Sequence, residues 1–306
     1  MQKFKSIPIL LATILFVLSS PGFQTVSAQA PVSIKISPLT FKYSLDKGEK
    51  KSDLISITNR SKFEVQIQSQ VEDFVMGDEE GTPQFLPQGS GTTSLATWVK
   101  VSLSKFTLAP LETKAVSFQI SVPKDAEPGG HYAAIFFKTL PKKAVKETTL
   151  GVAGRVGTLV LVEVTGEVKK TGEIVEFKAP KIVNRGPVNF KVRFKNTGTV
   201  HFQPKGAIKI SSWFNKNLAE IPLQEHEVLP NSIRLLWGKW DCRYLFGLYK
   251  ANLEMKDGEG KVLTASVRFF AFPWKIVLIV LAGIFILFVI LRLLKKKFKI
   301  VRKEKK

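Results

Sequence analysis

The sequence has little of the chemistry on which enzymes and metal sites depend. One of its 306 residues is a cysteine, Cys242, and three are histidines. A single cysteine excludes an intramolecular disulfide, so each folded part must be stable through packing alone. His131, His201 and His226 lack the H-x-x-H and H-E-x-x-H spacing of zinc sites. We therefore expect no metal site, an exposed His131, and ordinary loop or strand positions for the other two histidines.

Motifs for covalent catalysis and phosphate binding are also missing. The sequence contains no G-x-S-x-G and no glycine loop of the kind that cradles phosphates. Cys242 follows Trp240 and Asp241 in an apolar segment, which favours a buried, inert thiol over a reactive one. The sequence therefore predicts no catalytic residue, no cofactor and no enzymatic activity, and an enzyme is kept only as a third hypothesis.

Long uncharged apolar runs are missing from the middle of the chain, but one lies near its end. Residues 276–291 carry no charge, and residues 273–294 make a segment of 22 residues. About 20 apolar residues cross a bilayer core, so we predict a transmembrane helix at 273–294. The residues expected to anchor this helix at the two membrane surfaces are Trp274, Lys275, Arg292, Lys295, Lys296 and Lys297.

Acidic residues are rare after this segment, which predicts its orientation. Residues 292–306 hold nine Lys or Arg and one acid, and basic flanks stay on the cytoplasmic side. Residues 295–306 are therefore expected to be a cytoplasmic tail, and everything before the helix to lie outside. Residues 1–28 fit a signal peptide, with Lys3 and Lys5 before an apolar stretch at 7–18. Cleavage is predicted after Ala28, with a cut after Ala30 as the alternative.

No long helical period appears between these two segments. Instead, Pro and Gly recur at short intervals between runs rich in Val, Ile, Phe and Thr, and residues 63–71 alternate with period two. This pattern predicts an all-β fold of two immunoglobulin-like β-sandwich domains plus one C-terminal transmembrane helix. The domains are placed at residues 29–166 and 167–272.

A repeated pattern supports two sandwiches of one topology. Asn59 and Asn196 each end a predicted strand, and G-x-Y-x-A occurs near the end of both halves. We interpret Tyr132 and Tyr249 as structural tyrosine corners, in which the hydroxyl bonds the backbone just upstream. Gly130 and Gly247 open the two motifs and belong to the same corners.

Charge and exposed aromatics suggest where partners bind. Residues 29–166 carry 16 basic and 14 acidic groups, whereas residues 167–275 carry 19 and 10, so the excess lies nearest the membrane. The expected partners are anionic lipid headgroups near the second domain and the tail, or anionic wall polymer. The alternative is that the lysine-rich surface only keeps the protein soluble.

Trp213 and Phe214 are adjacent, so a strand would expose one of them as a possible binding element. The acidic residues Asp78, Glu79 and Glu80 are expected at a solvated hairpin tip rather than in a calcium loop.

The layout resembles that of the WxL-interacting proteins of Gram-positive surfaces. The resemblance lies in ISPLTFKYSLDKGEKKSDLISITN (36–59), LAP (108–110), VPKDAEPGGHYAAIFF (122–137) and the lysine-rich tail. It implies immunoglobulin-like or Fn3-like domains, the first binding peptidoglycan and the second a WxL-type surface protein. The paired sandwiches are also similar to pilus-assembly chaperones, which lack a membrane span.

These observations lead to two functional hypotheses. The main one is a non-enzymatic, membrane-anchored surface protein whose β-sandwich domains bind cell-wall polymer and/or a surface protein, with no nucleic-acid partner. The alternative is a chaperone-like assembly or secretion factor that holds client subunits at the outer face of the membrane. An exposed, unpaired edge strand in the first domain would favour the alternative.

Overall fold

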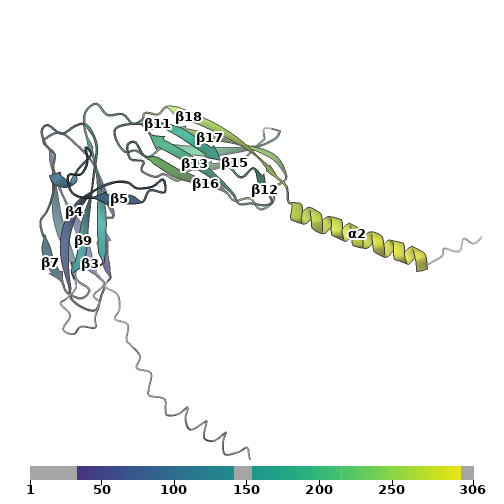
Figure 1. Cartoon of the computed structure of the whole chain (residues 1–306), viewed down its shortest axis with the longest axis horizontal. Coiled ribbons are helices and arrows are strands. Elements are labelled where there is room, and N and C mark those ends of the chain that lie inside the picture. Colours follow the sequence, from purple (N-terminus) through teal and green to yellow (C-terminus); the bar gives the residue numbers. More distant parts are fainter. Residues whose placement is uncertain (1–32, 141–153, 215, 298–306) are drawn as a thin grey trace, which may run out of the picture.

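The computed structural model describes residues 33–140, 154–214 and 216–297. The predicted signal peptide and residues 298–306 of the predicted tail lie outside the described residues. Figure 1 shows two groups of strands followed by one helix, and the two groups lie across each other in an L. The prediction of an all-β chain with one apolar C-terminal helix is confirmed.

The first group, here called the N-terminal sandwich, contains the strands β1 to β10. Its first sheet has the order β1-β3-β8-β6, and its second has the order β2-β10-β9-β4-β5, with β7 also paired to β4. A short 3₁₀ helix, η1 (Ala96–Trp98), precedes β6. The strands are β1 (Ile34–Ser37), β2 (Thr40–Leu45), β3 (Lys50–Asn59), β4 (Val65–Met76), β5 (Pro83–Leu86), β6 (Val99–Val101), β7 (Lys105–Leu108), β8 (Thr113–Ser121), β9 (Gly129–Leu140) and β10 (Arg155–Val164).

The second group, here called the C-terminal sandwich, contains the strands β11 to β18. Its sheets have the orders β11-β13-β16 and β12-β18-β17-β14-β15. The strands are β11 (Gly172–Lys178), β12 (Ile182–Val183), β13 (Val188–Asn196), β14 (Lys205–Ser212), β15 (Asn217–Pro222), β16 (Ile233–Trp240), β17 (Gly247–Lys256) and β18 (Val262–Ala271). Phe190, Phe194 and Phe269 are fully buried between these two sheets.

Strand β9 is buried on both of its faces, which explains its continuous run of small and apolar residues. Its first nine residues are all buried. Ala133, Ile135 and Phe137 belong to the core between the two sheets of the N-terminal sandwich. Tyr132 and Phe136 point the other way, into a second apolar cluster outside that core. Such a strand cannot alternate apolar and polar residues, because neither face meets water.

The two buried asparagines hold equivalent turns in the two sandwiches. The Nδ2 of Asn59 donates to the carbonyls of Phe63 (2.8 Å), Ala109 (3.0 Å) and Leu108 (3.2 Å). The Nδ2 of Asn196 donates to the carbonyls four residues ahead, at Val200 (2.9 Å), and 32 residues ahead, at Val228 (2.8 Å). Each Oδ1 accepts the backbone N–H two residues later. The same side chain therefore ties a strand end to a distant loop in both sandwiches.

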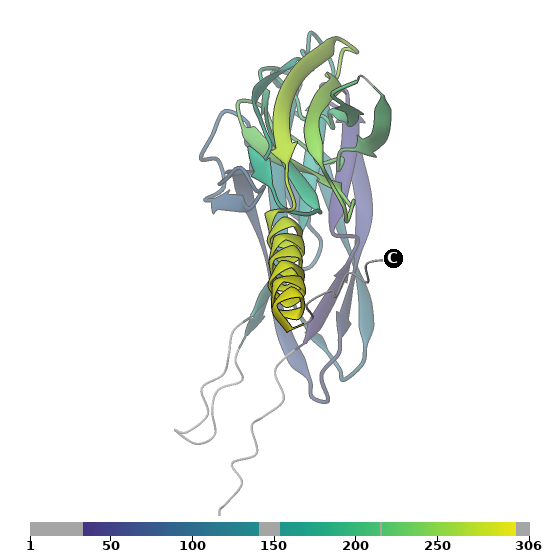
Figure 2. The same ribbon diagram turned by 90° about the vertical axis from the view of Figure 1, so that its right-hand side faces the viewer.

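The C-terminal helix α2 (Trp274–Lys297) follows β18 almost directly. Only Phe272 and Pro273 separate them, and the N–H of Phe272 still donates to the carbonyl of Val183 at 2.8 Å. Residues Trp274–Lys295 are long and apolar enough to cross a membrane, and none of their most apolar stretch is buried in the structure. Figure 2 shows β18 leading straight into α2.

Replacing Asn59 with alanine is expected to destabilise the N-terminal sandwich by about 3 kcal/mol. The change removes one donor group and leaves buried carbonyls without partners, each costing roughly 1–3 kcal/mol. Asn189→Ala, at an exposed position of β13, is the matched control and should have little effect. The measurement is chemical denaturation of the detergent-solubilised chain, and equal midpoints for the two variants would contradict the assigned role.

Candidate functional site

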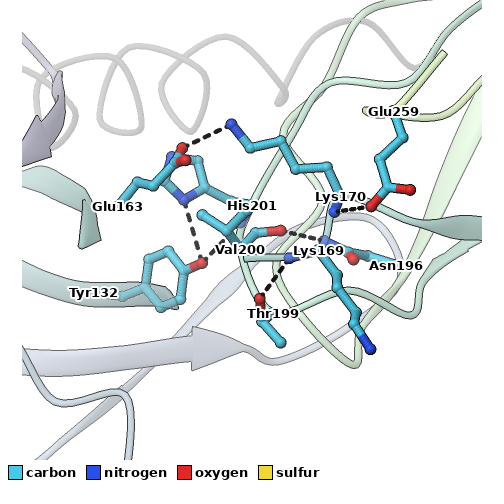
Figure 3. Close-up of polar contacts among 9 residues, drawn as sticks. All are labelled: Tyr132, Glu163, Lys169, Lys170, Asn196, Thr199, Val200, His201 and Glu259. Carbon is cyan, nitrogen blue, oxygen red and sulfur yellow. Dashed lines mark hydrogen bonds and ion pairs between the residues drawn. The ribbon is translucent and has the colours of Figure 1, made fainter. Parts of the chain in front are cut away.

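The junction between the two sandwiches is organised around Tyr132 and His201. The hydroxyl of Tyr132 accepts the backbone N–H of His201 at 3.1 Å and lies 3.2 Å from its Nδ1 (Figure 3). Tyr132 is 2% exposed and His201 is 9% exposed. Because the hydroxyl already accepts from the backbone, its own proton is free to be donated to Nδ1. Two buried polar side chains thereby satisfy each other across the junction.

Glycine is required next to this hydroxyl. A Cβ at Gly130 would lie 1.9 Å from the Tyr132 hydroxyl oxygen. The N–H of Gly130 donates to the carbonyl of Thr199 at 2.9 Å, which adds a backbone contact between the sandwiches. Leu229 of the C-terminal sandwich completes the junction by packing into the cluster of Phe74 and Tyr132.

His201 is neutral in the folded protein. Burial lowers the pKa of its imidazole from the usual 6.5 to about 4, with Lys42 and Lys170 acting in the same direction and Glu163 opposing them. Burial also raises the pKa of the Tyr132 hydroxyl, so this group stays protonated. A neutral imidazole with an accepting Nδ1 fits the hydroxyl proton that faces it.

The turn between β4 and β5 forms a second contact with the C-terminal sandwich. The carbonyl of Glu79 accepts the N–H of Leu235 at 2.6 Å, at the outer edge of β16. The carboxylate of Glu79 pairs with the guanidinium of Arg193, and this hydrogen bond lowers the pKa of the carboxyl. The expectation of a solvated hairpin tip is therefore wrong for Glu79, because the tip reaches the edge of a sheet 114 residues or more further along the chain.

Gly81 lies against the guanidinium of Arg234 where the β4–β5 turn contacts β16. A Cβ at Gly81 would lie 0.7 Å from Nη1 of Arg234, and the backbone of Gly81 has a φ of +87°. Two ion pairs, Lys42 with Glu227 and Lys170 with Glu163, also join the sandwiches. These pairs are partly exposed and contribute little on their own.

The two tyrosine motifs behave differently from each other. The hydroxyl of Tyr249 contacts both the N–H and the carbonyl of Phe246 at 3.1 Å, three residues upstream. The hydroxyl of Tyr132 instead reaches His201, so the predicted local corner at Tyr132 is corrected to a contact between sandwiches. Gly247 has a φ of +108°, a left-handed conformation that favours glycine.

His131 is buried rather than exposed. Its side chain is 4% exposed, its Nε2 is 3.0 Å from the carbonyl of Glu127, and its ring centroid lies 4.3 Å from that of Trp98.

Cys242 is half-buried, with its Sγ 3.5 Å from the carbonyl of Tyr244. Across residues 33–140, 154–214 and 216–297, no three His, Cys, Asp or Glu side chains are placed to hold a metal ion.

Trp213 and Phe214 are both exposed, by 66% and 89%. The expectation that only one would be exposed assumed a strand, but β14 ends at Ser212 and the pair lies in the turn that follows.

Of the predicted anchors, Trp274 and Lys275 begin α2, and Arg292, Lys295, Lys296 and Lys297 lie in its last two turns. The Nζ of Lys275 is 5.6 Å from the Trp274 ring centroid.

The N-terminal sandwich has a sheet edge that sequence reasoning did not locate. Strand β2 pairs with β10 from Leu159 to Val164 only, because the chain crosses from the other sheet just before β2. The N–H of Leu159 donates to Leu39, away from β9. Since alternate strand residues point their backbone groups to one side, Arg155 and Gly157 also face away from β9.

Within the described residues, no strand pairs with residues 155–157 on that side. We call this the free edge. Apolar side chains flank it on both faces of the sheet. Val156 packs against the main core, and the Arg155 guanidinium lies 4.2 Å from the Phe136 ring centroid. A backbone edge with apolar surroundings can accept an added strand.

No family model matches the chain, and no curated protein matches it. Among solved structures, it is similar to the class 5 fimbriae chaperone CfaA, at 14% identity and a TM-score of 0.40, covering 78% of this chain and 99% of that one. It is also similar to the E. coli chaperone DraB, at 12% identity and a TM-score of 0.39, covering 80% and 98%. A complex of the Salmonella enterica SafA pilin with the SafB chaperone matches at 11% identity and a TM-score of 0.38, covering 79% and 98%. At such identities the likeness concerns the fold alone.

These findings correct the main functional prediction. The structures named above are chaperones, one of class 5 fimbriae and one in complex with a pilin, and none is named as a wall-binding surface protein. The main prediction, a membrane-anchored surface protein whose β-sandwich domains bind cell-wall polymer and/or a surface protein, is therefore wrong.

Acidification is expected to weaken the folded protein through His201. Its folded pKa of about 4 lies below the usual 6.5, so its contribution is complete above pH 6.5 and is lost as the pH falls toward 4. Between pH 7 and pH 5 the loss should be roughly 2 kcal/mol. His201→Gln should remove this part of the pH dependence, as measured by denaturant midpoints at both pH values.

The matched control for that change is His226→Asn, at a partly exposed histidine whose pKa is also lowered by burial. It should keep most of the pH dependence of the unaltered chain. The role given to His201 is wrong if His201→Gln and the unaltered chain lose the same stability on acidification.

Gly81→Ala is expected to loosen the Glu79 contact, because the new Cβ would displace Arg234. Gly89→Ala is the matched control, since Gly89 has a similar φ of +80° but its nearest neighbour, Thr97, is 3.5 Å away. Hydrogen exchange of the Leu235 amide should accelerate in Gly81→Ala and stay close to that of the unaltered chain in Gly89→Ala. Equal exchange in both variants would mean that strain, and not the Arg234 contact, governs this loop.

Proposed function

We propose that the chain is a non-enzymatic, chaperone-like assembly or secretion factor. It holds client subunits, secreted or surface proteins, at the outer face of the membrane to which it is tethered. The observation that supports this most directly is the free edge of β10 in the N-terminal sandwich. An edge of this kind lends its backbone hydrogen bonds to an extended segment of another chain.

The proposed topology follows from the sequence and from α2. Residues 1–28 act as the signal peptide, the chain crosses the membrane once at 273–294, and the basic tail remains in the cytoplasm. The two immunoglobulin-like domains at 29–166 and 167–272 then lie outside. The resemblance of the layout to WxL-interacting proteins stays a prediction.

The junction gives the proposed client site a fixed support. Buried contacts at Tyr132 and His201 and the Glu79 contact at β16 join the sandwiches at two separate places. Two contacts restrict rotation far more than one flexible linker would. A client strand added at β10 would therefore be held in one orientation relative to α2.

The chemistry of the free edge suggests what a client strand looks like. Its backbone would pair with residues 155–157, and its side chains would alternate between the Val156 side and the Phe136 side. Both sides are apolar, apart from the Arg155 guanidinium that pairs with Glu72 at 3.0 Å. Alternating apolar residues are what an unfolded or incomplete β-sandwich subunit exposes.

Gly157→Pro tests the free edge directly. Proline removes the outward N–H and is tolerated where that N–H faces away from the sheet, so the variant should still fold. It should bind clients about tenfold more weakly, because one hydrogen bond of about 1.4 kcal/mol is lost. Gly157→Ala is the matched control: any side chain here crowds the Phe136 ring at 2.6 Å, but alanine keeps the N–H.

The full chain is assayed in lipid nanodiscs with a β-sandwich protein from which one edge strand has been deleted. The unaltered chain and Gly157→Ala should form a complex and suppress light scattering by the incomplete protein, and the intact parent protein should not bind. Equal binding by Gly157→Pro and Gly157→Ala, or no binding by the unaltered chain, would rule the proposal out.

A further inference from the structure

The end of the C-terminal sandwich next to α2 exposes a group of large aromatic side chains. Trp213 and Phe214 lie in the turn after β14, and Tyr244 and Phe246 lie between β16 and β17, with exposures of 66%, 89%, 70% and 71%. Exposure of large aromatic side chains to water is unfavourable, so a group of them on the surface indicates a site that another molecule covers.

The loops that carry these residues lie at one end of the sandwich, because Ser212 pairs with Tyr249 and Gly247 pairs with Ala271. Strand β18 leads into α2 at this end (Figure 1). The N–H of Trp213 donates to Leu248 at 3.1 Å, and Leu248 pairs with Phe270 in the last residues of β18. The Phe246 ring lies 6.2 Å from that of Phe272. The aromatic group and the start of α2 therefore lie at one level of the molecule. We call Trp213, Phe214, Tyr244 and Phe246 the aromatic rim.

A basic pocket lies beside the aromatic rim. It has a volume of about 400 Å³, and its walls include Arg185, Arg243 and Lys275 but no acidic residue. The first turn of α2 forms one wall, through Lys275 and Ile276. The acidic residue nearest to Arg243 in the sequence is Asp241, which is exposed to solvent and pairs with Lys239 at 3.6 Å. The pocket therefore presents three cations at the point where the chain enters α2.

The short connection decides what can cover this surface. Two residues separate β18 from α2, and two residues span at most about 7 Å. If α2 crosses a bilayer, the sandwich end cannot stand clear of the headgroups. Tyr and Trp side chains are enriched at this depth of a membrane, and each Lys or Arg near an anionic leaflet is attracted to it.

We propose that the aromatic rim and the basic pocket form a membrane-docking surface. The rim enters the headgroup region, and the pocket holds the phosphate of an anionic lipid between Arg185, Arg243 and Lys275. This inference rests on the membrane-spanning topology given above but not on client binding at β10. It means that the C-terminal sandwich lies against the bilayer as well as being tethered to it.

The experiment uses the full chain in nanodiscs of phosphatidylcholine, with or without phosphatidylglycerol. Cys242→Ser removes the native thiol, and single cysteines at Phe214, Tyr244 or Glu259 carry a nitroxide label. Glu259 is the matched control because it is exposed in the hairpin between β17 and β18, at the sandwich end near Lys170. Collisions with lipid-soluble oxygen and with a water-soluble nickel complex report the depth of each label.

Labels at 214 and 244 should gain oxygen collisions and lose nickel collisions relative to the label at 259. Arg185→Glu combined with Arg243→Glu should shift both labels toward water in the anionic nanodiscs and leave the label at 259 unchanged. Lys191→Glu combined with Lys239→Glu, at two lysines on the β13 and β16 strands, is the control for net charge.

Three results would overturn the proposal. The first is equal nickel accessibility at 214, 244 and 259, and the second is an Arg185 and Arg243 effect no larger than that of the control pair. The third is protection of the rim in detergent that grows with protein concentration, which would assign it to a second copy of the chain. Client binding by the Gly157 variants is measured separately, so loss of docking with retained client binding refutes this inference alone. A chain that fails to insert into nanodiscs refutes the topology as well.

Discussion

The arrangement of this protein depends on a buried hydroxyl that serves two β-sandwiches at once. The oxygen of Tyr132 accepts the backbone N–H of His201 and lies beside its Nδ1, with both side chains nearly inaccessible to water. A buried polar group without a partner costs roughly 1–3 kcal/mol, so any shift of the sandwiches that parts these groups while they stay buried is unfavourable. The apolar contact of Leu229 with Phe74 and Tyr132 adds to this cost. The other contacts at the junction are the backbone hydrogen bonds donated by Gly130 and Leu235 and several partly exposed ion pairs, and they reinforce a geometry that this buried group fixes.

Sequence patterns predicted what depends on local repetition. Period-two runs indicated strands, the uncharged run at 276–291 indicated the helix, and the asparagines at 59 and 196 indicated matching turns that the structure places in equivalent surroundings. They could not indicate contacts made between distant segments. The partner of Tyr132 lies 69 residues away, and the loop at Glu79 docks on a strand edge that exists only once β13 and β16 have paired. The free edge was missed for the same reason, since it is defined by where β2 stops pairing with β10. His131 was expected to be exposed because it lies in the turn at Tyr132, whereas Trp98 and the carbonyl of Glu127 supply a buried setting.

One short motif serves two purposes in this chain. In the C-terminal sandwich the hydroxyl of Tyr249 stays within its own turn, at Phe246. In the N-terminal sandwich the equivalent hydroxyl leaves its turn and reaches the neighbouring sandwich. The glycine at 130 allows this, because any Cβ there would occupy the space of the hydroxyl. A repeated sequence pattern therefore identified a repeated fold but not the role of each copy, which depends on what lies beyond the motif.

The two-residue connection between β18 and α2 has a mechanical consequence. A helix that tilts or rotates in a bilayer usually moves independently of the parts outside, because a linker absorbs the motion. Here there is almost no linker, and the junction around Tyr132 restricts motion of the two sandwiches relative to each other. If α2 spans a bilayer, any tilt of α2 would therefore be transmitted to both sandwiches, and the strand edge at β10 would move with them. The distance of this edge from the membrane surface would then depend on the thickness of the membrane and on the tilt of α2.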